Sequence, residues 1–546
     1  MNIVLKGHIT PTDKARSDYL YLPFELPAPA SRLHVQYSFS ASISSDQREG
    51  GNVIDIGLFD PRGADFPGGA GFRGWSGSAR RKFTITPASG TPGYLPGPLP
   101  AGHYQIILGL YRISPHGADY TIEIEADLGG GAEETRRQGD KETRREGKGE
   151  ESPCHPPSLS PPHPRSPAPL HLRSIWLRGD LQTHTEHSDA KGTLAQLAAR
   201  ARGLDLNFLA VTDHNTVSHH AHMAALARDD PSTTPPRGSG RRLLLIPGQE
   251  VTTYYGHMNI WGTHRWCDFR CKTNEDMAAV IDLAHASGAL CSINHPKTDG
   301  PTWKYDTTLP VDAMEVWQGP WPWRNEESLA LWDSLLNAGR RLPAVGGSDY
   351  HCPPSEETNF LWLGQPTTWV KAAERSAPAI LDAIRAGRVS ISATPKGPRL
   401  DIRAMAGTAT AEMGEELALA PGTAIEVEVQ VERGVGRTLR LIADGALAHE
   451  EPITTAPATV RVALAAERYL RAELIGDVTR ELLSARAPND LDLRGWRWAL
   501  SNPVYVAYED HLMRLNREER RGEVPARFSA FPPRPSPRRI PRESTG

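Results

Sequence analysis

Two apolar stretches, separated by a helical one and each followed at once by histidine and aspartate, constrain the fold of this chain more than any other feature. The stretches cover residues 175–181 and 204–211, and residues 194–202 between them have the spacing of an amphipathic helix. This is the order strand, helix, strand. In a barrel of parallel strands the carboxyl ends of the strands share one rim, so side chains distant in sequence meet there. The residues expected to meet from these two strand ends are His184, Asp189 and His214.

The same pattern continues along the chain. Three further apolar runs, residues 243–247, 290–294 and 342–346, are each followed closely by histidine or a carboxylate. The side chains in question are Glu250, His257, His295, Asp349 and His351. A single histidine among the 20 in the chain is more often a surface or core residue than a ligand, but a cluster changes those odds. Apolar runs that alternate with helical stretches favour a β/α barrel over residues 173–394.

The residue types in this cluster indicate a metal site. Imidazoles and carboxylates suit Zn²⁺, Mn²⁺ or Fe²⁺, and the absence of cysteine at the strand ends argues against a purely structural zinc site. A carboxylate such as Glu250 can bridge two ions, and ions about 3.5–4 Å apart can hold a hydroxide while they neutralise charge on a phosphoryl oxygen. The sequence has no Gly-x-Ser-x-Gly elbow, Walker A loop or Gly-x-Gly-x-x-Gly behind a strand. Serine hydrolases and nucleotide-binding classes are therefore not indicated.

The remaining parts of the chain differ in composition. Residues 1–128 consist of short alternating segments divided by Gly, Pro and Ser, which predicts a β-sandwich. Residues 129–172 are first charged and then rich in Pro and Ser, which predicts a disordered linker. The pattern of short strands returns over residues 395–508 and predicts a second β-sandwich. Residues 509–546 are rich in Arg and Pro, and we expect a solvated tail rather than a nucleic-acid arm.

Charge and cysteine content limit the compartment and the partners. A formal net charge of −4 argues against a globally basic nucleic-acid binder. No apolar run approaches the roughly 18 residues of a membrane span, and no apolar segment follows Met1 as in a signal peptide. Five cysteines, an odd number, do not suggest a disulfide framework. We therefore expect a cytoplasmic protein without a membrane partner, and no obligate protein partner is indicated.

Ordered motifs in the central part resemble those of the PHP superfamily, the polymerase and histidinol phosphatase metallohydrolases. The motifs are Asp180-Leu-Gln-Thr-His184, Ser188-Asp189, Thr212-Asp-His214, Glu250, Gly256-His257, Asn294-His-Pro296 and Gly347-Ser-Asp-Tyr-His351. The segment after Glu250 and the endings at residues 381–388 and 500–504 resemble the carbaryl hydrolase-like branch. The resemblance covers about residues 177–394. It implies an α/β fold, a distorted (β/α)7 barrel flanked by the two β-sandwich domains, with two or three divalent ions at its rim.

Carried over by position, the resemblance implies three sets of metal ligands. The first is His184, Glu250 and Asp349, with Gln182 where the family normally has histidine. The second is Asp189, His214 and the shared Glu250, and the third is His257, His295 and His351. The metals expected are zinc, manganese or iron.

Three further residues are candidates for catalysis or substrate binding. Asp213 stands beside a ligand, where it is a candidate base, although an orienter of an imidazole is the favoured role. His187 takes a position that often lines the site in the family, and the alternative is that it faces solvent. Lys297, close to His295, is a candidate phosphate contact or equally an exposed loop lysine.

Three functions follow from these residues. The first, which we predict, is a metal-dependent phosphoesterase that acts on a small phosphomonoester or on a nucleic-acid 5′ end as a 5′-3′ exonuclease. The second is a metal-dependent ester or carbamate hydrolase, because the same chemistry attacks phosphorus or carbonyl carbon and the pocket alone selects. The third is a non-catalytic metal-binding module, suggested by Gln182 but disfavoured by the nearly complete ligand set.

Overall fold

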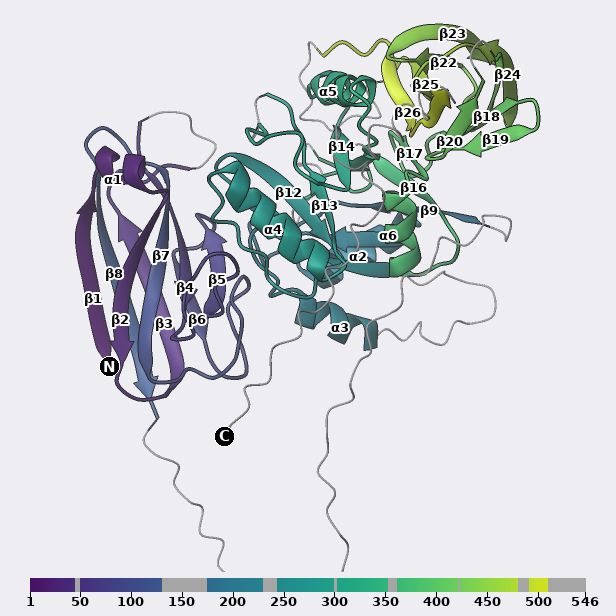
Figure 1. Cartoon of the computed structure of the whole chain (residues 1–546). Coiled ribbons are helices and arrows are strands. Elements are labelled where there is room, and N and C mark those ends of the chain that lie inside the picture. The colour runs from purple at the N-terminus through teal and green to yellow at the C-terminus, as the bar shows by residue number, and fades with distance from the viewer. Residues whose placement is uncertain are drawn as a thin grey trace, which may run out of the picture.

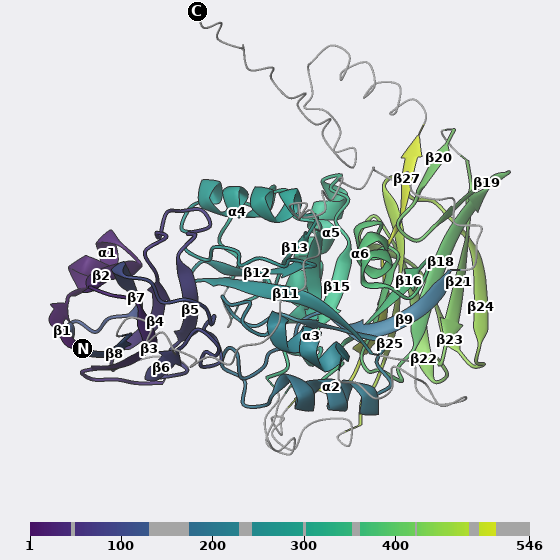
Figure 2. The same ribbon diagram turned by 90° about the horizontal axis from the view of Figure 1, so that it is seen from below.

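The computed structural model describes residues 1–44, 50–129, 174–228, 243–298, 302–351, 361–420, 423–479 and 491–508. These residues have mixed α/β structure, and a central part lies between two β-rich parts (Figure 1, Figure 2). Apart from its first residue, the predicted linker at residues 129–172 lies outside the described residues, as does the predicted tail at residues 509–546. Within the described ranges, no helix combines the length and the apolar character that crossing a membrane requires.

The N-terminal part consists of two antiparallel four-stranded sheets. One contains β1 (Asn2–Ile9), β8 (Ala118–Leu128), β3 (Ala30–Phe39) and β6 (Lys82–Ile85), in that order. The other contains β2 (Tyr19–Leu26), β7 (Gly102–Arg112), β4 (Val53–Phe59) and β5 (Phe72–Gly77), and the short helix α1 (Pro11–Arg16) joins β1 to β2. Strands of both sheets contribute to one buried core, as in a β-sandwich. We call residues 1–128 the N-terminal sheet pair.

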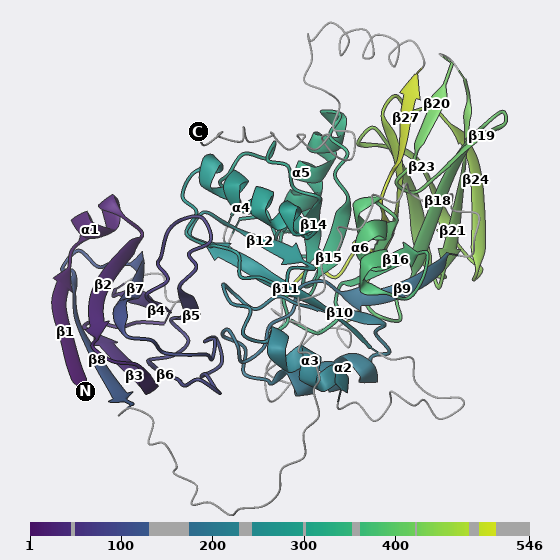
Figure 3. The ribbon, with the colours of Figure 1, turned by 60° about the horizontal axis from the view of Figure 1, so that its bottom comes forward.

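The central part alternates strands and helices. Its first half contains β9 (Ile175–Asp180), α2 (Leu194–Gly203), β10 (Phe208–Val211), α3 (His220–Arg228), β11 (Leu244–Thr253) and β12 (Gly256–Trp261). Its second half contains α4 (Asn274–Ala286), β13 (Leu290–Ile293), β14 (Ala313–Gln318), α5 (Asn325–Asn337), β15 (Ala344–Gly347), β16 (Thr367–Ala372), α6 (Ala377–Arg385) and β17 (Val389–Ser392). Figure 3 shows α2 and α3 side by side at one edge of this part.

The strand directions correct the expectation of a purely parallel barrel. Strands β9, β10 and β11 pair in parallel, and so do β13, β14 and β15. Between these runs, β12 pairs antiparallel with both β11 and β13, so that β11 and β12 form a hairpin. At the other end, β9 pairs antiparallel with β16. The pairing is one continuous path, and a seven-stranded barrel is not shown by it.

Side chains, rather than a strand ladder, join β15 to its neighbours β16 and β17. The Thr368 hydroxyl donates to the carbonyl of Gly346 at 2.7 Å and accepts from the Gly346 N–H at 2.9 Å. Asn502 links the main chains of Ala344 and Val389 in the same way. This seam brings the residues after β15 beside the end of β9, where Ser348 N–H donates to the Asp180 carboxylate at 3.0 Å.

The C-terminal part continues the central sheet. Strand β17 pairs antiparallel with β26 (Trp496–Ser501), and the path runs on through β25 (Tyr469–Gly476), β22 (Arg437–Ala443) and β23 (Ala446–Ile453), with β27 (Val504–Tyr508) and β20 (Glu416–Leu419) beside it. A separate sheet of β19 (Ala409–Glu412), β18 (Arg399–Ala406), β21 (Ile425–Glu432) and β24 (Ala458–Leu464) packs against these strands. Residue 394, the predicted domain boundary, lies in the connection between β17 and β18, but the central sheet crosses this boundary through the pairing of β17 with β26, and the boundary stays a prediction.

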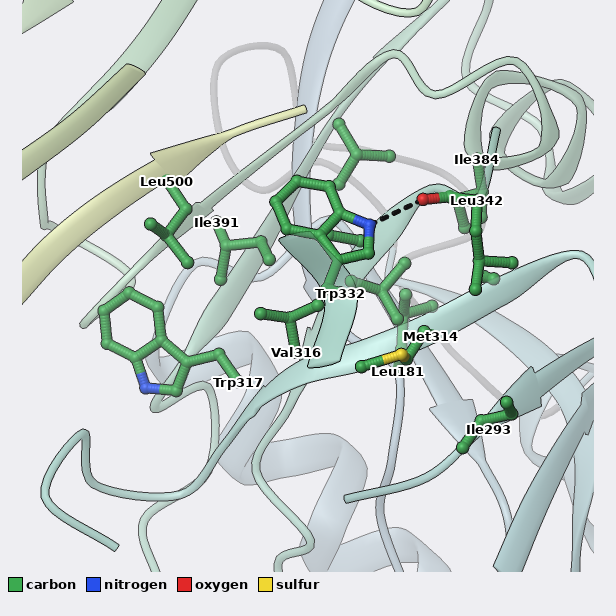
Figure 4. Packing of buried hydrophobic residues seen from close by; sticks show 14 of the residues in the cluster. Leu181, Ile293, Met314, Val316, Trp317, Trp332, Leu342, Ile384, Ile391 and Leu500 are labelled. Atoms are coloured by element: carbon green, nitrogen blue, oxygen red, sulfur yellow. Dashed lines mark hydrogen bonds between the residues drawn. The ribbon is translucent and has the colours of Figure 1, made fainter. Parts of the chain in front are cut away.

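A large apolar core holds the central and C-terminal parts together. Figure 4 shows Trp332 of α5 within this core, close to Val316 of β14 and Ile391 of β17. The indole is fully buried, and its Nε1–H donates to the carbonyl of Leu342 at 2.7 Å. A buried polar group needs such a partner, since leaving it unpaired costs about 1–3 kcal/mol. The core thus fixes the strands whose ends carry the predicted ligands.

The N-terminal sheet pair packs on the central part through aromatic side chains and one buried carboxylate. Phe72 and Trp266 stack with ring centroids 3.8 Å apart. Asp55 accepts a hydrogen bond from the Tyr254 hydroxyl at 2.9 Å, and its side chain is buried. Burial raises the pKa of Asp55 from 3.8 to about 6, against the opposing effect of the hydrogen bond from Tyr254.

Asp55→Asn is expected to change the pH dependence of stability. Because the pKa of Asp55 is raised in the folded protein, its contribution is fully present below about pH 4 and is lost as the pH rises through about 6. As the pH rises from about 4 to about 6, the free energy of unfolding of the variant should therefore increase by about 2–3 kcal/mol relative to that of the wild type. Urea titrations at a series of pH values measure this difference. Asp119→Asn, which removes an exposed carboxylate of the same sheet pair, is the control, and a pH-independent difference for Asp55→Asn would contradict the prediction.

Candidate metal centre

The nine predicted ligands come together at one place, which we call the rim. It is formed by the residues at or after the ends of β9, β10, β13 and β15, together with the β11–β12 hairpin. His184 follows β9, His214 follows β10, His295 follows β13, and Asp349 and His351 follow β15. Glu250 of β11 lies diagonally across from His257 of β12, since its direct partner is Asn259. Isolated bridges between Thr183 and Tyr350 and between His214 and Glu250 tie these strand ends to one another.

Glu250 lies at the centre of the rim. Its side chain is fully buried, and nitrogen atoms from several rim segments surround its two oxygens. Those atoms are Asn294 Nδ2 at 2.9 Å, His214 Nδ1 at 3.0 Å, Gln182 Nε2 and His257 Nδ1 at 3.1 Å, and His184 Nε2 and His295 Nε2 at 3.4 Å. A carboxylate so placed can serve two ions at once.

Asp189 marks the side of the rim that faces solvent. Its Oδ1 atom lies 3.2 Å from His351 Nε2 and 3.6 Å from His214 Nε2. The His184 ring is stacked between His214 and His351, with centroid distances of 4.2 and 4.3 Å. The Asp189 side chain is 49% exposed, whereas that of His184 is fully buried. The rim is therefore open on the Asp189 side and closed beneath Glu250.

The structure groups the predicted ligands in a partly different way from the three predicted sets. Three groups at the rim have ligand atoms within 4.8 Å of one another: His184, Glu250 and Asp349; His214, Glu250 and His257; and His184, Asp189, His214 and His351. The first group matches the first predicted set without Gln182. The third predicted set is divided, because His351 lies with Asp189 whereas His257 and His295 lie beside Glu250. Which residues share an ion stays a prediction.

Several buried atoms at the rim lack hydrogen-bond partners, and this fits a divalent cation. Neither ring nitrogen of His184 has one, although Nε2 is 3.0 Å from Asp349 Oδ1. Oε2 of Glu250 also has no well-aligned hydrogen bond, although His214 Nδ1 lies 3.0 Å from it. Such atoms cost about 1–3 kcal/mol each when they are left unpaired in the interior. A cation shared by imidazole nitrogen and carboxylate oxygen would satisfy them, and this donor set suits zinc, manganese or iron.

Carboxylates outweigh burial at two of the rim histidines, His214 and His351, whereas burial lowers the pKa of His184 and His257. Burial lowers the pKa of His214, but the carboxylates of Glu250 and Asp189 outweigh it and raise the pKa to about 9. Burial likewise lowers the pKa of His351, and Asp189 outweighs it to give a pKa of about 10. Imidazoles that hold their protons this firmly lie in a field that also attracts metal cations.

Gln182 contacts both carboxylates of the first group. Its Nε2 donates to Glu250 Oε1 at 3.1 Å and to Asp349 Oδ1 at 3.2 Å, while its Oε1 is buried without a partner. Gln318 donates to the other oxygen of Asp349 at 3.1 Å. Gln182 therefore lies among the predicted ligands of the first ion. Whether its oxygen binds that ion stays a prediction.

Both carboxylate oxygens of Asp213 accept hydrogen bonds from donors within the protein. It accepts from the N–H and the hydroxyl of Thr185 and from the Ser188 hydroxyl, each at 2.7 Å, and His219 Nδ1 lies at 3.1 Å. Burial raises the pKa of Asp213, but His219 and His187 outweigh it and lower the pKa to about 2. These contacts favour a role in holding the loop that follows His184. The catalytic role predicted for Asp213 stays a prediction.

His187 lies beneath the N-terminal sheet pair instead of facing solvent. Its side chain is buried, and Nδ1 lies 2.7 Å from the Ser218 hydroxyl. Burial lowers the pKa of His187 to about 4. The alternative of a solvent-facing histidine is therefore wrong. The predicted catalytic role of His187 is untested.

Lys297 is buried rather than exposed, which corrects the alternative of an exposed loop lysine. Its Nζ donates to three acceptors: the carbonyls of Gln318 and Trp323 at 3.1 and 2.6 Å, and Asn325 Oδ1 at 3.1 Å. An ammonium has three donors, so all of them are used within the protein. This arrangement favours a role in fixing residues 318–325, and contact with a phosphate stays a prediction.

The sequence reasoning missed two buried carboxylates that support the rim. Glu315 of β14 accepts from the His295 N–H at 2.9 Å, and burial raises the pKa of Glu315 well above its usual range. Asp180 accepts from the N–H groups of Gln182, Ser348 and Gly364 at 3.2, 3.0 and 2.8 Å. For Glu315 a signal existed, because it is the one charged residue within the apolar run at residues 313–317.

Two predicted ligands have an unusual backbone conformation. His295 and Asp349 have φ values of 28° and 54°, in the left-handed region that residues with a side chain rarely adopt. Such conformations cost on the order of 1–3 kcal/mol and cluster at functional sites. The adjoining Gly347 leaves no room for a side chain, because a Cβ there would lie 2.3 Å from Glu315 Oε1.

A further group of ligand-type residues lies away from the rim. His285, Cys291 and Asp312 have ligand atoms within 4.8 Å of one another. Asp312 accepts from His285 Nε2 and from the Cys291 N–H, both at 2.8 Å, and Arg385 Nε lies 3.7 Å from its other oxygen. These bonds already satisfy the carboxylate and give the group a structural role.

Comparisons with known proteins find only remote likenesses. No family model matches the chain, and no curated protein matches it. A two-domain protein from Bacteroides vulgatus, described as containing a predicted PHP-like metal-dependent phosphoesterase, is 17% identical, with a TM-score of 0.35 over 60% of this chain and 95% of that one. A putative metal-dependent phosphoesterase from Bifidobacterium adolescentis is 16% identical, with a TM-score of 0.25 over 34% and 90%. An amidohydrolase from Chromobacterium violaceum with bound sulfate is 17% identical, with a TM-score of 0.24 over 32% and 88%. Likenesses this weak leave the question of function to the side chains of the rim.

Proposed function

We propose that this chain is a metal-dependent hydrolase of the PHP type, a phosphoesterase that acts on a small phosphomonoester or on a nucleic-acid 5′ end. The observation that carries the proposal is the buried Glu250 carboxylate, surrounded by four imidazoles from separate rim segments, with ligand atoms that lack hydrogen-bond partners. A structural role alone does not account for so many unpaired ligand atoms in the interior. Two or three divalent ions account for them.

The residues that would hold the ions follow from the groups at the rim. They are His184, Glu250 and Asp349 with Gln182; His214, Asp189 and His351; and His257 and His295 beside Glu250. When bound, the ions would supply Lewis-acid charge to the reacting group. The structure supports an approach of the substrate from the side of Asp189 and His351, whose side chains are 49% and 30% exposed.

Other residues of the chain orient these ligands. Asn294 Nδ2 donates to Glu250 Oε1 at 2.9 Å, which fixes one carboxylate oxygen. Glu315 accepts the His295 N–H and so holds that strand end. Asp213 secures the loop between His184 and Asp189 through the Ser188 hydroxyl. Partners of this kind affect metal affinity by about 10–100-fold when they are removed.

We also propose the finer architecture that the strand pairing leaves open. The hydrogen bonds of Thr368 and Asn502 along the β15 seam support a distorted seven-stranded barrel within residues 173–394. The two sheets of residues 1–128 and those of residues 395–508 would then be flanking β-sandwich domains. We further propose that the protein is cytoplasmic and belongs to the carbaryl hydrolase-like branch.

An ester or carbamate hydrolase is the second candidate, and one observation favours it. Lys297, the cation close to ligand His295, has its three donors bound within the protein. A phosphate group carries charge that cationic side chains usually balance, whereas a carbonyl substrate does not require this. Because the donors of Lys297 are used within the protein, a carbonyl substrate remains a candidate beside a phosphate ester.

A substrate panel distinguishes the two candidates. We expect purified protein, supplied in turn with Mn²⁺, Zn²⁺ or Fe²⁺, to hydrolyse an aryl phosphomonoester or a 5′-phosphorylated oligonucleotide faster than a phosphodiester or an aryl carbamate. Activity should disappear with chelator and return with metal. Preference for the carbamate would replace the first candidate by the second. Metal binding without turnover of any of these substrates would contradict both and favour a binding module.

A further inference from the structure

We infer that the N-terminal sheet pair is part of the scaffold of the metal centre, and that Arg80 is a positioning residue for Asp189. The inference rests on the proposed function, since it concerns the same rim. It goes further because it assigns a role to a region in which the sequence shows no catalytic residues. Three contacts between the sheet pair and ligand-bearing loops carry it.

The first contact is made by Arg80, which follows β5. Its Nη1 donates to the carbonyl of Ser188 at 2.8 Å, and its Nη2 donates to the carbonyl of Glu186. Both carbonyls belong to the loop between His184 and Asp189, and Asp189 directly follows Ser188. The rigid planar guanidinium therefore fixes the backbone two residues apart, immediately before a predicted ligand.

The same loop is held from its inner side by the central part. The Ser188 hydroxyl donates to Asp213 at 2.7 Å, and the Glu186 N–H donates to the Gly192 carbonyl at 2.8 Å. The Asp189 side chain, by contrast, is about half exposed, so packing contributes little to its position. Its place near His214 and His351 therefore depends on the backbone of the loop, which Arg80 and Asp213 hold from opposite sides.

The second contact is made by Gly93, between β6 and β7. Its N–H donates to the Ser218 hydroxyl at 3.0 Å, and its carbonyl accepts from the Thr216 hydroxyl at 3.0 Å. Thr216 and Ser218 lie just after the ligand His214. Gly93 has a φ of 98°, and a Cβ there would lie 3.0 Å from the His187 carbonyl. Glycine thus allows the sheet pair to approach the loop that contains His187, which is the loop between His184 and Asp189.

The third contact is made with the turn of the β11–β12 hairpin, which lies between the ligands Glu250 and His257. The Tyr254 hydroxyl donates to Asp55 at 2.9 Å, and the Tyr255 hydroxyl donates to Asp18 at 2.9 Å. The Tyr254 ring also stacks on Tyr19, with centroids 5.9 Å apart.

Together the three contacts fix three segments that carry ligands of all three predicted ions: the loop with His184 and Asp189, the turn after His214, and the hairpin with Glu250 and His257. Loops are the segments of a protein that open most readily, whereas a metal site needs its ligands within about 0.5 Å of their working positions. Contacts from a separate sheet pair reduce that freedom. Loss of one of them should therefore weaken metal binding without removing a ligand.

Metal affinity tests this inference directly. We expect Arg80→Met, which keeps an unbranched apolar stem but removes the guanidinium and its donors, to weaken Mn²⁺ and Zn²⁺ binding in calorimetric or chelator-competition titrations by about 10–100-fold. Arg80→Lys should restore part of the loss. Saturating metal should return the activity of Arg80→Met, because every ligand is still present. Arg81→Met is the matched control, since Arg81 donates to Ser42 and lies over Phe39, both within the sheet pair.

Tyr254→Phe provides an independent variant, because it removes only the hydroxyl bonded to Asp55 and keeps the stacked ring. If Arg80→Met does not fold, as judged by circular dichroism and melting, the metal affinity of Tyr254→Phe tests the inference in its place. Native affinity in the folded Arg80→Met and in Tyr254→Phe, or an equal loss in Arg81→Met, would overturn the inference. If the wild-type protein binds no divalent metal, the proposed function itself fails, and that outcome is distinct from an unchanged affinity in the variants.

Discussion

Glu250→Ala is expected to abolish metal-dependent hydrolysis. The carboxylate lies within 3.4 Å of four imidazoles and belongs to two of the ligand groups at the rim, so its removal affects more than one ion. We expect the rate at fixed metal concentration to fall by at least about 10³-fold, in line with the losses seen when a central member of a catalytic set is removed. The metal content of the purified variant, measured by elemental analysis, should fall by at least one ion per chain.

Two further proteins make the Glu250 experiment decisive. Glu275→Ala removes an exposed carboxylate at the start of α4 and should keep full activity and metal content. Wild-type protein stripped by chelator should match Glu250→Ala in rate and regain activity with metal, whereas the variant should not. Full activity in Glu250→Ala or in stripped protein would show that the reaction does not use the rim as proposed.

Gln182→His is expected to tighten the binding of one metal ion. The amide lies 3.1 and 3.2 Å from Glu250 and Asp349, at the position where the resemblance implies a histidine. An imidazole nitrogen is a better donor to a borderline ion such as Zn²⁺ than an amide oxygen. Since loss of an outer partner costs about 10–100-fold in affinity, improvement of a direct ligand should gain at least about 10-fold. Titration with Zn²⁺ and Mn²⁺, with turnover measured in parallel, gives the result.

A second histidine variant separates this effect from that of an added imidazole alone. Gln430→His places the ring on the exposed face of β21, away from the rim, and should leave stoichiometry and affinity unchanged. The native glutamine also predicts a preference of the first site for Mn²⁺ over Zn²⁺, which the histidine should reverse. Unchanged stoichiometry and affinity in Gln182→His would mean that residue 182 does not face an ion.

The convergence of the ligands was predictable because parallel strands place their ends together. His184 and His214 follow β9 and β10, which pair in parallel as the pattern predicted. The hairpin of β11 and β12 was not predicted. Its turn is only Tyr254 and Tyr255 before Gly256, and this short, aromatic sequence lacks the usual Asn-Gly or Asp-Gly signal. Glu250 and His257 nevertheless reach the rim, since both lie on the hairpin.

Other parts of the site depend on contacts that no local pattern contains. Arg80 and Ser188 are 108 residues apart, and their contact arises only when the sheet pair docks on the central part. Lys297 has a loop-like sequence context but becomes buried because residues 318–325 fold over it. Glu315 lies within an apolar run that predicts a strand, and only the folded structure shows that its carboxylate accepts the His295 N–H. Local periodicity predicts elements and their ends but not these tertiary partners.

The pairing of β17 with β26 has a consequence for synthesis of the chain on the ribosome. Strand β17 ends at residue 392 and its partner begins at residue 496. At about 5–20 residues per second, the nascent chain grows for roughly 5–20 seconds before that partner is made. During this interval β17 is an open edge with unpaired main-chain groups, the kind of edge that recruits other strands. Chaperones that bind nascent chains, or fast translation of the residues between β17 and β26, would therefore raise the yield of native protein by protecting or shortening the exposure of this edge.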